Sequence, residues 1–268
     1  LVETYAHGGV KIATDSRVPL RVQSGDNIIL MNQATKGILF NEISQAFPSG
    51  IKDVYRIQTN NGCELKLTED HKIITQNGFV KVKDLTDQDE ILLQKGEGRF
   101  GSEEISVELD KVPYRHNLPN KWSQELGQIL GWLIGDGWLR SGDKNCRVGF
   151  TFSKEDKAIL DELKPLINRY YGRDIKEVKR ENGVYHLSYH RKNFVEFFEK
   201  MGVKPCQAHE KVVPEKIFSA SKEAVIGFLQ GIFSADGTVR GNPKSASQWV
   251  ALTSKSRDLL SGVQILLL

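Results

Sequence analysis

The chain has 268 residues, of which 39% are hydrophobic and 26% are charged, with a formal net charge of +3. This composition excludes disordered, fibrous and disulfide-rich proteins, and the length allows one large or two ordinary domains. No apolar run approaches the roughly 20 residues of a membrane span, and the start is not a signal peptide, so we expect a soluble cytoplasmic protein. Cys63, Cys146 and Cys206 lie far apart and predict neither disulfides nor a zinc site.

Residues 12–95 have the pattern of short strands joined by turns. Asn61-Gly62 and Asn77-Gly78 each lie between β-branched and aromatic residues. Both residue types tolerate the positive φ of a tight hairpin turn, so each pair predicts a β-hairpin. We therefore expect an all-β module here, followed by a glycine- and proline-containing linker over residues 96–120.

After the linker, helices alternate with strands, so the fold class of the whole chain is α+β. Tyr185, Leu187 and Tyr189 alternate with polar residues, which predicts a strand with one buried face after a turn at Asn182-Gly183. Residues 164–204 hold ten Lys or Arg against five Asp or Glu, which suits a phosphate-facing surface or a merely solvated one. Four helices are expected: Ser123 to Gly135, a second that Ser153 caps, Phe194 to Met201, and Lys222 to Ala235. The expected strands are Arg147–Phe152 and Val184–His190.

An internal repeat stands out in the second half of the chain. Gly127-x3-Gly131-x3-Gly135-Asp136-Gly137 matches Gly227-x3-Gly231-x3-Ala235-Asp236-Gly237 at an offset of one hundred residues. Small residues four apart form a stripe on one helix face and allow two backbones to approach closely. If the two helices pack in the same direction around a pseudo-two-fold axis, Asp136 and Asp236 come together at their C-terminal ends.

Two carboxylates at two negative helix ends repel each other. A divalent cation would relieve this repulsion, and hard carboxylate oxygens with few other ligands suit Mg²⁺, which takes part in phosphodiester cleavage. The sequence therefore predicts Asp136 and Asp236 as metal ligands and catalytic residues. The alternative is that each Asp-Gly pair merely ends a helix, with the glycine in the left-handed conformation.

Two nonapeptides in the repeat resemble the signature motifs of the LAGLIDADG homing endonuclease family: Ile129-Leu130-Gly131-Trp132-Leu133-Ile134-Gly135-Asp136-Gly137 and Leu229-Gln230-Gly231-Ile232-Phe233-Ser234-Ala235-Asp236-Gly237. The resemblance implies that Asp136 and Asp236 bind the metal. Lys211-Val212-Val213-Pro214 is similar to a segment of intein endonucleases, which implies a catalytic role for Lys211. The resemblance to the LAGLIDADG family also implies a monomer with internal pseudo-two-fold symmetry that binds a long site in double-stranded DNA.

The family fold is a helix pair flanked by two saddle-shaped antiparallel sheets along the DNA major groove. On that analogy the polar side of the alternating strand and nearby basic residues would contact DNA. These expected DNA-binding residues are Lys179, Arg180, His186, Ser188, His190 and Arg191.

The all-β module resembles the Hint fold of inteins through Thr68-x-x-His71 and the segments around it, residues 61–71, 78–85 and 89–93. In that family the His assists the first acyl shift of protein splicing and the Thr supports it. The initial Cys or Ser nucleophile is missing, because Lys11-Ile12-Ala13 stands before Asp15-Ser16. The expected organisation is a host remnant at 1–11, a splicing module at 12–95, the linker at 96–120 and an endonuclease domain at 121–268 whose second repeat is incomplete.

Three functional hypotheses follow. The first is an intein-encoded, site-specific DNA endonuclease, which the presence of both Asp136 and Asp236 favours. The second is a sequence-specific DNA-binding protein or RNA-splicing cofactor that has kept the scaffold without cleavage. The third is autoprocessing with a passenger nuclease, against which the missing nucleophile argues.

Overall fold

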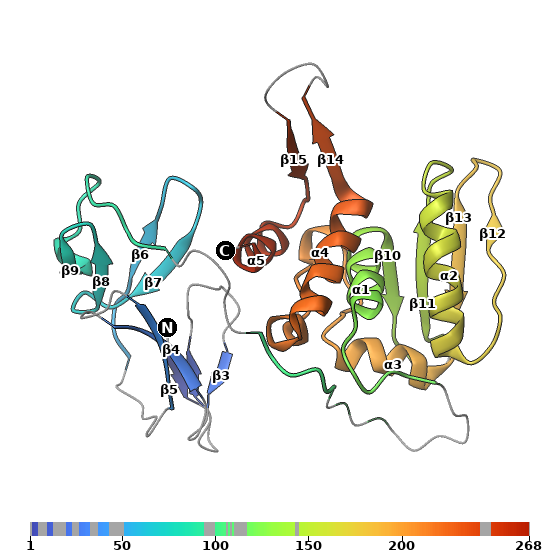
Figure 1. The fold of residues 1–268 in the computed structure, drawn as a ribbon, viewed down its shortest axis with the longest axis horizontal. Helices are drawn as coiled ribbons and strands as arrows, with labels where there is room; N and C mark the ends of the chain where they lie inside the picture. Colours follow the sequence, from blue (N-terminus) through green and yellow to red (C-terminus); the bar gives the residue numbers. More distant parts are fainter. Residues whose placement is uncertain are drawn as a thin grey trace. The chain divides into compact units, whose positions relative to one another are not determined.

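The structure is a computed structural model that describes residues 2–4, 10–12, 20–22, 27–32, 37–42, 51–93, 100–105, 107, 109, 117–142, 145–241 and 248–267. The chain divides into two compact units, residues 1–96 with 268, and residues 97–267 (Figure 1). In the part of the chain that the structure describes, every helix falls short of the length and apolar character that crossing a bilayer requires.

The first unit contains antiparallel strands, as the turn residues predict. A three-stranded sheet has the order β1-β2-β3, and three separate hairpins follow. The Asn61-Gly62 and Asn77-Gly78 hairpins are confirmed, with Gly62 and Gly78 at φ 88° and 96°. A small core of Leu67, Ile73 and Val82 packs between the last two hairpins. The strands are β1 (Val2–Thr4), β2 (Val10–Ile12), β3 (Leu20–Val22), β4 (Asn27–Asn32), β5 (Gly37–Glu42), β6 (Tyr55–Gln58), β7 (Glu64–Leu67), β8 (Lys72–Thr75) and β9 (Gly78–Lys81), followed by η1 (Val82–Asp84).

The described part of the segment expected to be a linker packs on the second unit. The Gly101 N–H donates to the Ala220 carbonyl at 2.9 Å, and the Ile105 N–H donates to the Asn120 carbonyl at 2.9 Å. Ile105 and Leu118 also contact the main core of this unit. These residues therefore behave as an ordered arm of the second unit and not as a free connector.

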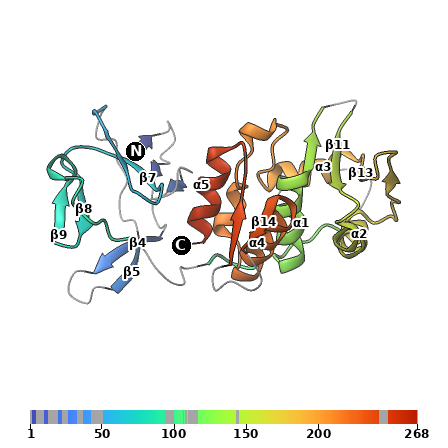
Figure 2. The same ribbon diagram turned by 90° about the horizontal axis from the view of Figure 1, so that it is seen from above.

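The second unit is built on a four-stranded antiparallel sheet of order β10-β11-β13-β12 and on helices that cover one of its faces. Figures 1 and 2 both show α1 beside α4, and α2 beside β11 and β13. A separate two-stranded sheet pairs β14 with β15. The elements are α1 (Gln124–Asp136), β10 (Gly137–Arg140), β11 (Arg147–Phe152), α2 (Lys157–Tyr171), β12 (Val178–Lys179), β13 (Tyr185–Tyr189), α3 (Lys192–Lys200), η2 (Ala208–Glu210), η3 (Glu215–Ser219), α4 (Lys222–Asp236), β14 (Gly237–Arg240), β15 (Trp249–Leu252) and α5 (Arg257–Leu266).

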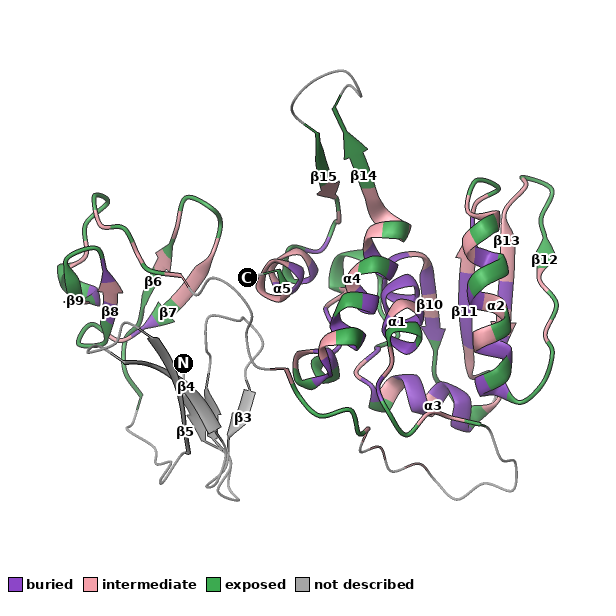
Figure 3. Ribbon diagram, viewed as in Figure 1, coloured by how far each residue is buried: buried purple, intermediate pink, exposed green. Residues whose placement is uncertain are grey.

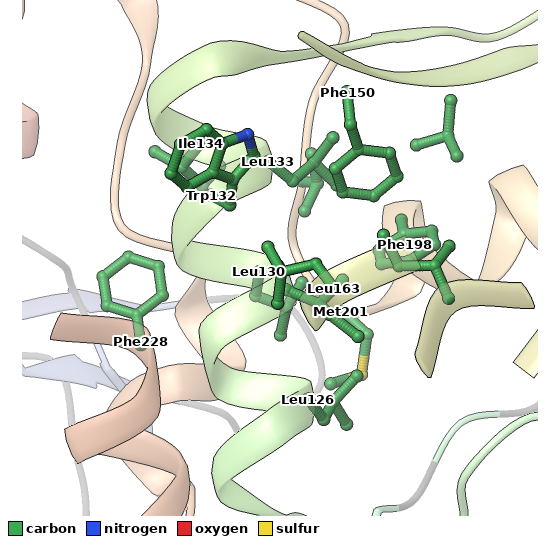
Figure 4. Packing of buried hydrophobic residues seen from close by; sticks show 14 of the residues in the cluster. Leu126, Leu130, Trp132, Leu133, Ile134, Phe150, Leu163, Phe198, Met201 and Phe228 are labelled. Carbon is green, nitrogen blue, oxygen red and sulfur yellow. The ribbon is translucent and has the colours of Figure 1, made fainter. Parts of the chain in front are cut away.

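The core of the second unit lies between the sheet and α1, α2 and α3 (Figure 4). Trp132 of α1 stacks on Phe152 of β11 with ring centroids 4.8 Å apart, and its indole N–H donates to the Thr151 carbonyl at 3.0 Å. The Tyr189 hydroxyl donates to the buried Asn168 side chain at 2.8 Å. These three polar side chains inside the core therefore have hydrogen-bond partners, as burial requires. Phe228 brings α4 into the same core.

One local prediction is wrong, and so is one feature of the alternative interpretation of the two Asp-Gly pairs. Ser153 does not cap α2: its N–H and hydroxyl both donate to the Asp156 carboxylate, at 3.0 and 2.6 Å, and Asp156 is the residue before the helix. Gly137 and Gly237 do not end their helices in the left-handed conformation, because their φ values are −114° and −82°. Each instead leads directly from a helix into a strand.

The two sheets differ in how far they are covered (Figure 3). Leu139 of β10 and Val148 of β11 are 7% and 0% exposed. Val239 and Val250, which pair with each other in the two-stranded sheet of β14 and β15, are 75% and 59% exposed. Among the described residues, the first repeat thus has a well-covered sheet of four strands, whereas the second repeat has an exposed sheet of two strands.

Candidate active site

The two glycine stripes pack directly against each other. A Cβ on Gly127 would collide with the Ala224 carbonyl of α4, and a Cβ on Gly227 would collide with the Gln124 carbonyl of α1. Further along, a Cβ on Gly135 would collide with Ala235. Successive contacts thus advance in the same direction on both helices, so α1 and α4 are parallel and end together. Close packing explains why helix-destabilising glycines occupy these positions.

Asp136 and Asp236 are the last residues of the two paired helices. Both side chains are half-buried, and a Cβ on Gly135 would lie 3.5 Å from the Asp236 Oδ2 atom. Burial, then the charge of Asp236, raises the pKa of Asp136 from 3.8 to about 6. Burial also raises the pKa of Asp236. The ionised pair is therefore poorly compensated by its surroundings.

Lys211, the expected catalytic lysine, lies at the same place. Its Nζ donates to the Gly135 carbonyl at 2.6 Å and to the Gly137 carbonyl at 3.4 Å. Burial lowers the pKa of Lys211, and the nearby carboxylates of Asp236 and Asp136 oppose that shift. An ammonium at the C-terminal end of a helix is favourable, because it faces the negative end of the helix dipole. The structure thus brings Asp136, Asp236 and Lys211 into one site.

The strand register shows which of the expected DNA-binding residues share a face, because directly opposed residues in antiparallel strands lie on the same side. His186 opposes Thr151, and Ser188 opposes Gly149. Burial, and then the charge of Arg180, lowers the pKa of His186, which places Arg180 near it. Burial, and then Arg147, likewise lowers the pKa of His190. His186, Ser188, His190 and Arg180 therefore belong to one polar surface.

Lys179 and Arg191 lie elsewhere. Lys179 opposes Tyr185, so these two side chains lie on the same face of the sheet. Tyr185 and the buried Leu187 lie on one face of β13 and His186 on the other, so Lys179 lies on the face opposite to His186. Its Nζ is 5.7 Å from the centroid of the Tyr185 ring. Arg191 precedes α3, and its guanidinium lies 5.0 Å from the ring centroid of Tyr171 in α2. Both cations are thus on the helix-covered side of the sheet.

The polar surface has further members that the sequence pattern did not reveal. Trp138 opposes Gly149, and a Cβ on Gly149 would collide with the Trp138 indole, so this ring lies flat across the glycine. The Arg147 guanidinium is 5.7 Å from the same ring. We call this surface the polar sheet face and define it as Trp138, Arg140, Arg147, Gly149, Thr151, Arg180, His186, Ser188 and His190. The available signal in the sequence was the alternation of Arg147, Gly149 and Thr151 with the apolar residues Val148, Phe150 and Phe152.

A second lysine was also missed in the sequence. Lys111-Val112-Pro113 precedes Asp136 by the same 25 residues that separate Lys211 from Asp236. The repeat thus extends upstream of the two nonapeptides. Lys111 lies outside the described residues.

Thr68 and His71 form a short turn in the first unit. The His71 N–H donates to the Thr68 carbonyl at 3.1 Å, and His71 is exposed while Thr68 is half-buried. A hydrogen bond from the Thr68 side chain lowers the pKa of Asp70, which lies between the two. The Thr68 hydroxyl is therefore engaged with Asp70, a residue that the Thr-x-x-His pattern did not single out.

The sequence model of the LAGLIDADG-like domain matches residues 123–202 and 223–268. These residues form a LAGLIDADG-like domain. The match includes both nonapeptides, α1 and α4, and the four-stranded sheet, so the predicted family membership of this part is confirmed. Lys211 lies between the two matched segments of the LAGLIDADG-like domain.

The chain is similar to segments of much longer proteins. A DNA polymerase of Thermococcus hydrothermalis is 30% identical over an alignment of 226 residues, which covers 81% of this chain and 13% of the polymerase. The replicative DNA helicase DnaB of a Nostoc species is 26% identical over an alignment of 277 residues, which covers 99% of this chain and 29% of the helicase. The chain therefore spans less than a third of the length of these curated relatives.

Solved structures of two kinds resemble parts of the chain. A variant of the Ssp DnaB mini-intein is 26% identical, with a TM-score of 0.25, and the match covers 26% of this chain and 49% of that one. The homing endonuclease I-DmoI, in complex with its target DNA, is 16% identical, with a TM-score of 0.32, and the match covers 54% of this chain and 95% of that one.

Proposed function

We propose that the protein is an intein-encoded homing endonuclease that makes metal-dependent double-strand cuts at a long, specific DNA site. The observation that carries this proposal is the meeting of Asp136 and Asp236 at the shared end of two parallel helices, with the Lys211 ammonium beside them. A pair of ionised carboxylates held there at a cost in repulsion is the arrangement expected of a cation site. A helix end with a merely structural role does not require a pair of ionised carboxylates.

The two carboxylates fit a hard divalent cation, and we propose Mg²⁺. Burial raises both pKa values by more than the charge of Lys211 lowers them, and a cation would supply the remaining compensation. Among the described residues, no group of three or more His, Cys, Asp or Glu side chains is placed so that it could hold a metal ion. Mg²⁺ suits such a sparse site, because it keeps several waters and binds substrate phosphate. When bound, it would activate water and stabilise charge on the scissile phosphate.

Lys211 supplies fixed positive charge at the same place. Its Nζ is hydrogen-bonded to the Gly135 carbonyl, so the ammonium is already oriented before DNA arrives. Preorganised charge stabilises the negative charge that develops on a phosphate during cleavage without further reorganisation. We assign Lys211 to this role and Asp136 and Asp236 to metal binding.

The polar sheet face is the proposed DNA-binding surface of the first repeat. Arg140, Arg147 and Arg180 can neutralise phosphates, whereas His186, Ser188 and Thr151 can meet base edges. The contacts between α1 and α4 are reciprocal, which supports a monomer whose two halves are related by a pseudo-two-fold axis. Each half would then place one carboxylate near one DNA strand.

The relatives support an intein as the carrier of the endonuclease. The DNA polymerase and the DNA helicase have unrelated names, and yet each contains a segment similar to most of this chain. That segment is a minor part of the length of either protein. An inserted element that is independent of its host's function explains this distribution. We propose that residues 12–95 are its splicing module, with Thr68 and His71 at the former splice site. Standard splicing is not expected, because Lys11-Ile12-Ala13 offers no thiol or hydroxyl.

Cleavage of a randomised DNA duplex library in the presence of Mg²⁺ tests the proposed function. We expect cutting at a defined site by the wild-type protein and none by the Asp136→Asn plus Asp236→Asn variant. Asp87→Asn plus Asp161→Asn is the matched control, because it removes two exposed carboxylates outside the site and should cut normally. Specific binding without cutting would favour the DNA-binding or RNA-splicing-cofactor alternative. Neither cutting nor binding by the wild-type protein would refute the proposal.

A further inference from the structure

Helix α5 is joined to the segment that carries Lys211 through a single buried hydroxyl. Ser256, the residue before α5, is 1% exposed. Its hydroxyl donates to the Lys211 carbonyl at 2.5 Å and accepts from the Leu259 N–H at 3.1 Å. The same side chain thus caps α5 and fixes the backbone of Lys211.

A second contact between α5 and this segment lies one and a half turns further along the helix. A Cβ on Gly262 would lie 2.7 Å from the Val213 Cγ2 atom, so only glycine allows α5 to come this close. Val213 is 2% exposed and lies two residues after Lys211. The segment is therefore held on both sides of Val212, at Lys211 by a hydrogen bond and at Val213 by packing.

These contacts continue to the candidate active site. The backbone of Lys211 is bonded to Ser256, and its side chain is bonded to the Gly135 and Gly137 carbonyls. Lysine has a long, flexible side chain, so the position of its ammonium depends on where its backbone is held. An unbroken series of contacts therefore runs from α5 through Lys211 to the end of α1, where Asp136 lies.

We propose that Ser256 is a positioning residue of the endonuclease, which with Gly262 makes α5 the support that holds the Lys211 ammonium at the carboxylate pair. This inference rests on the proposed function for its catalytic consequence. Its structural content, that α5 immobilises Lys211, does not depend on cleavage. Small displacements of a catalytic group reduce rates strongly, by up to about 100-fold for roughly 1 Å.

Three variants separate the hydrogen bond to Lys211 from the capping of α5. Ser256→Gly removes the donor, and glycine is well tolerated at a helix N-cap. Ser256→Thr keeps a hydroxyl that can both donate and accept. Gly262→Ala leaves the cap intact and displaces Val213. Ser221→Gly is the control, because Ser221 caps α4 through the Ala224 N–H just as Ser256 caps α5 through Leu259.

Single-turnover cleavage of the selected DNA site gives the catalytic readout. We expect Ser256→Gly and Gly262→Ala to cut about 10- to 100-fold more slowly with an unchanged Kd for DNA. Ser256→Thr should stay within about threefold of the wild-type rate, and Ser221→Gly should cut at the wild-type rate. Equal losses in Ser256→Gly and Ser221→Gly would assign the effect to helix capping and overturn the proposal.

Reductive methylation of lysines, followed by mass spectrometry of the metal-free protein, gives a readout without DNA. We expect Lys211 to react several-fold faster in Ser256→Gly and Gly262→Ala than in the wild type, with exposed Lys121 as the internal reference. Unchanged labelling of Lys211 in both folded variants would overturn the proposal. If the wild-type protein cuts no DNA, the proposed function fails, and the labelling result alone decides whether α5 holds Lys211.

Discussion

Gly131 and Gly231 face each other across the interface between α1 and α4, and a Cβ on either glycine would lie 3.0 Å from the Cα atom of the other. The same added atom on Gly131 would also collide with the Phe228 carbonyl, and on Gly231 with the Gln128 carbonyl. Backbone therefore packs on backbone at the centre of the helix pair. The position of both site carboxylates depends on this contact, because they lie little more than one turn further on.

Gly131→Ala should destabilise the protein although alanine favours a helix. The gain in helix propensity is about 0.5–1 kcal/mol, whereas forcing an extra methyl group into a packed interface costs about 1–3 kcal/mol. We expect the free energy of unfolding in urea to fall by about 1–2 kcal/mol. Ser234→Ala, at an exposed position of α4, should change it little. A Gly131→Ala protein as stable as the wild type would contradict the observed packing.

The stability of the metal-free protein should fall as the pH rises through the titration range of Asp136. Its pKa in the folded protein is about 6, against an ordinary value of 3.8. Between these values the folded state binds the proton and the unfolded state does not, so raising the pH favours unfolding. We expect a loss on the order of 1 kcal/mol, allowing for solvent screening. Thermal unfolding in EDTA from pH 4 to pH 7 measures it, and Asp136→Asn should flatten the profile.

Mg²⁺ should stabilise the protein more at pH 7 than at pH 5. At the lower pH the Asp136 carboxyl is mostly protonated, so the cation must displace a proton before it binds. Stabilisation by a ligand follows its affinity for the folded state. The shift in Tm on adding Mg²⁺, measured at both pH values, tests this. Asp136→Asn plus Asp236→Asn should abolish the shift, and an equal shift in that variant would place the metal elsewhere.

Arg180 and Lys179 are adjacent in sequence and should differ in their effect on DNA binding. Arg180 is near His186 on the polar side of the sheet, whereas Lys179 lies on the face opposite to His186, beside Tyr185. Each phosphate contact contributes about 0.9 to the slope of log affinity against log salt concentration. Arg180→Ala should reduce the magnitude of this slope by about one, and Lys179→Ala should leave it unchanged. Equal effects of the two variants would refute the assigned faces.

The helix pair could be predicted from the sequence because its physical cause is local. Small residues four apart line one side of a helix, and two such stripes satisfy each other by close packing. The position of Asp136 and Asp236 follows from that packing and from the shared direction of the helices. The hairpins at Asn61-Gly62 and Asn77-Gly78 are equally local, because the turn residues themselves determine the conformation.

The faces of Lys179 and Trp138 could not be predicted, because they depend on strand register. β12 has only two residues, so its own sequence does not show which one opposes Tyr185. A one-residue slip would exchange the faces of Lys179 and its neighbours. Trp138 reads as a core residue until the register places it over Gly149. The contact of Ser256 with Lys211 joins positions 45 residues apart and has no local signature.

The glycines and the aspartates of the repeat differ in what their loss would do to the protein. Each glycine on α1 or α4 is held against the backbone of the other helix, so replacing it disturbs the fold. The two half-buried carboxylates are not needed for this packing, and replacing them with neutral side chains would relieve the repulsion between them. If the proposed cleavage were no longer under selection, copies of this gene would therefore be expected to lose the aspartates first, leaving a well-folded protein with its proposed DNA-binding surface intact.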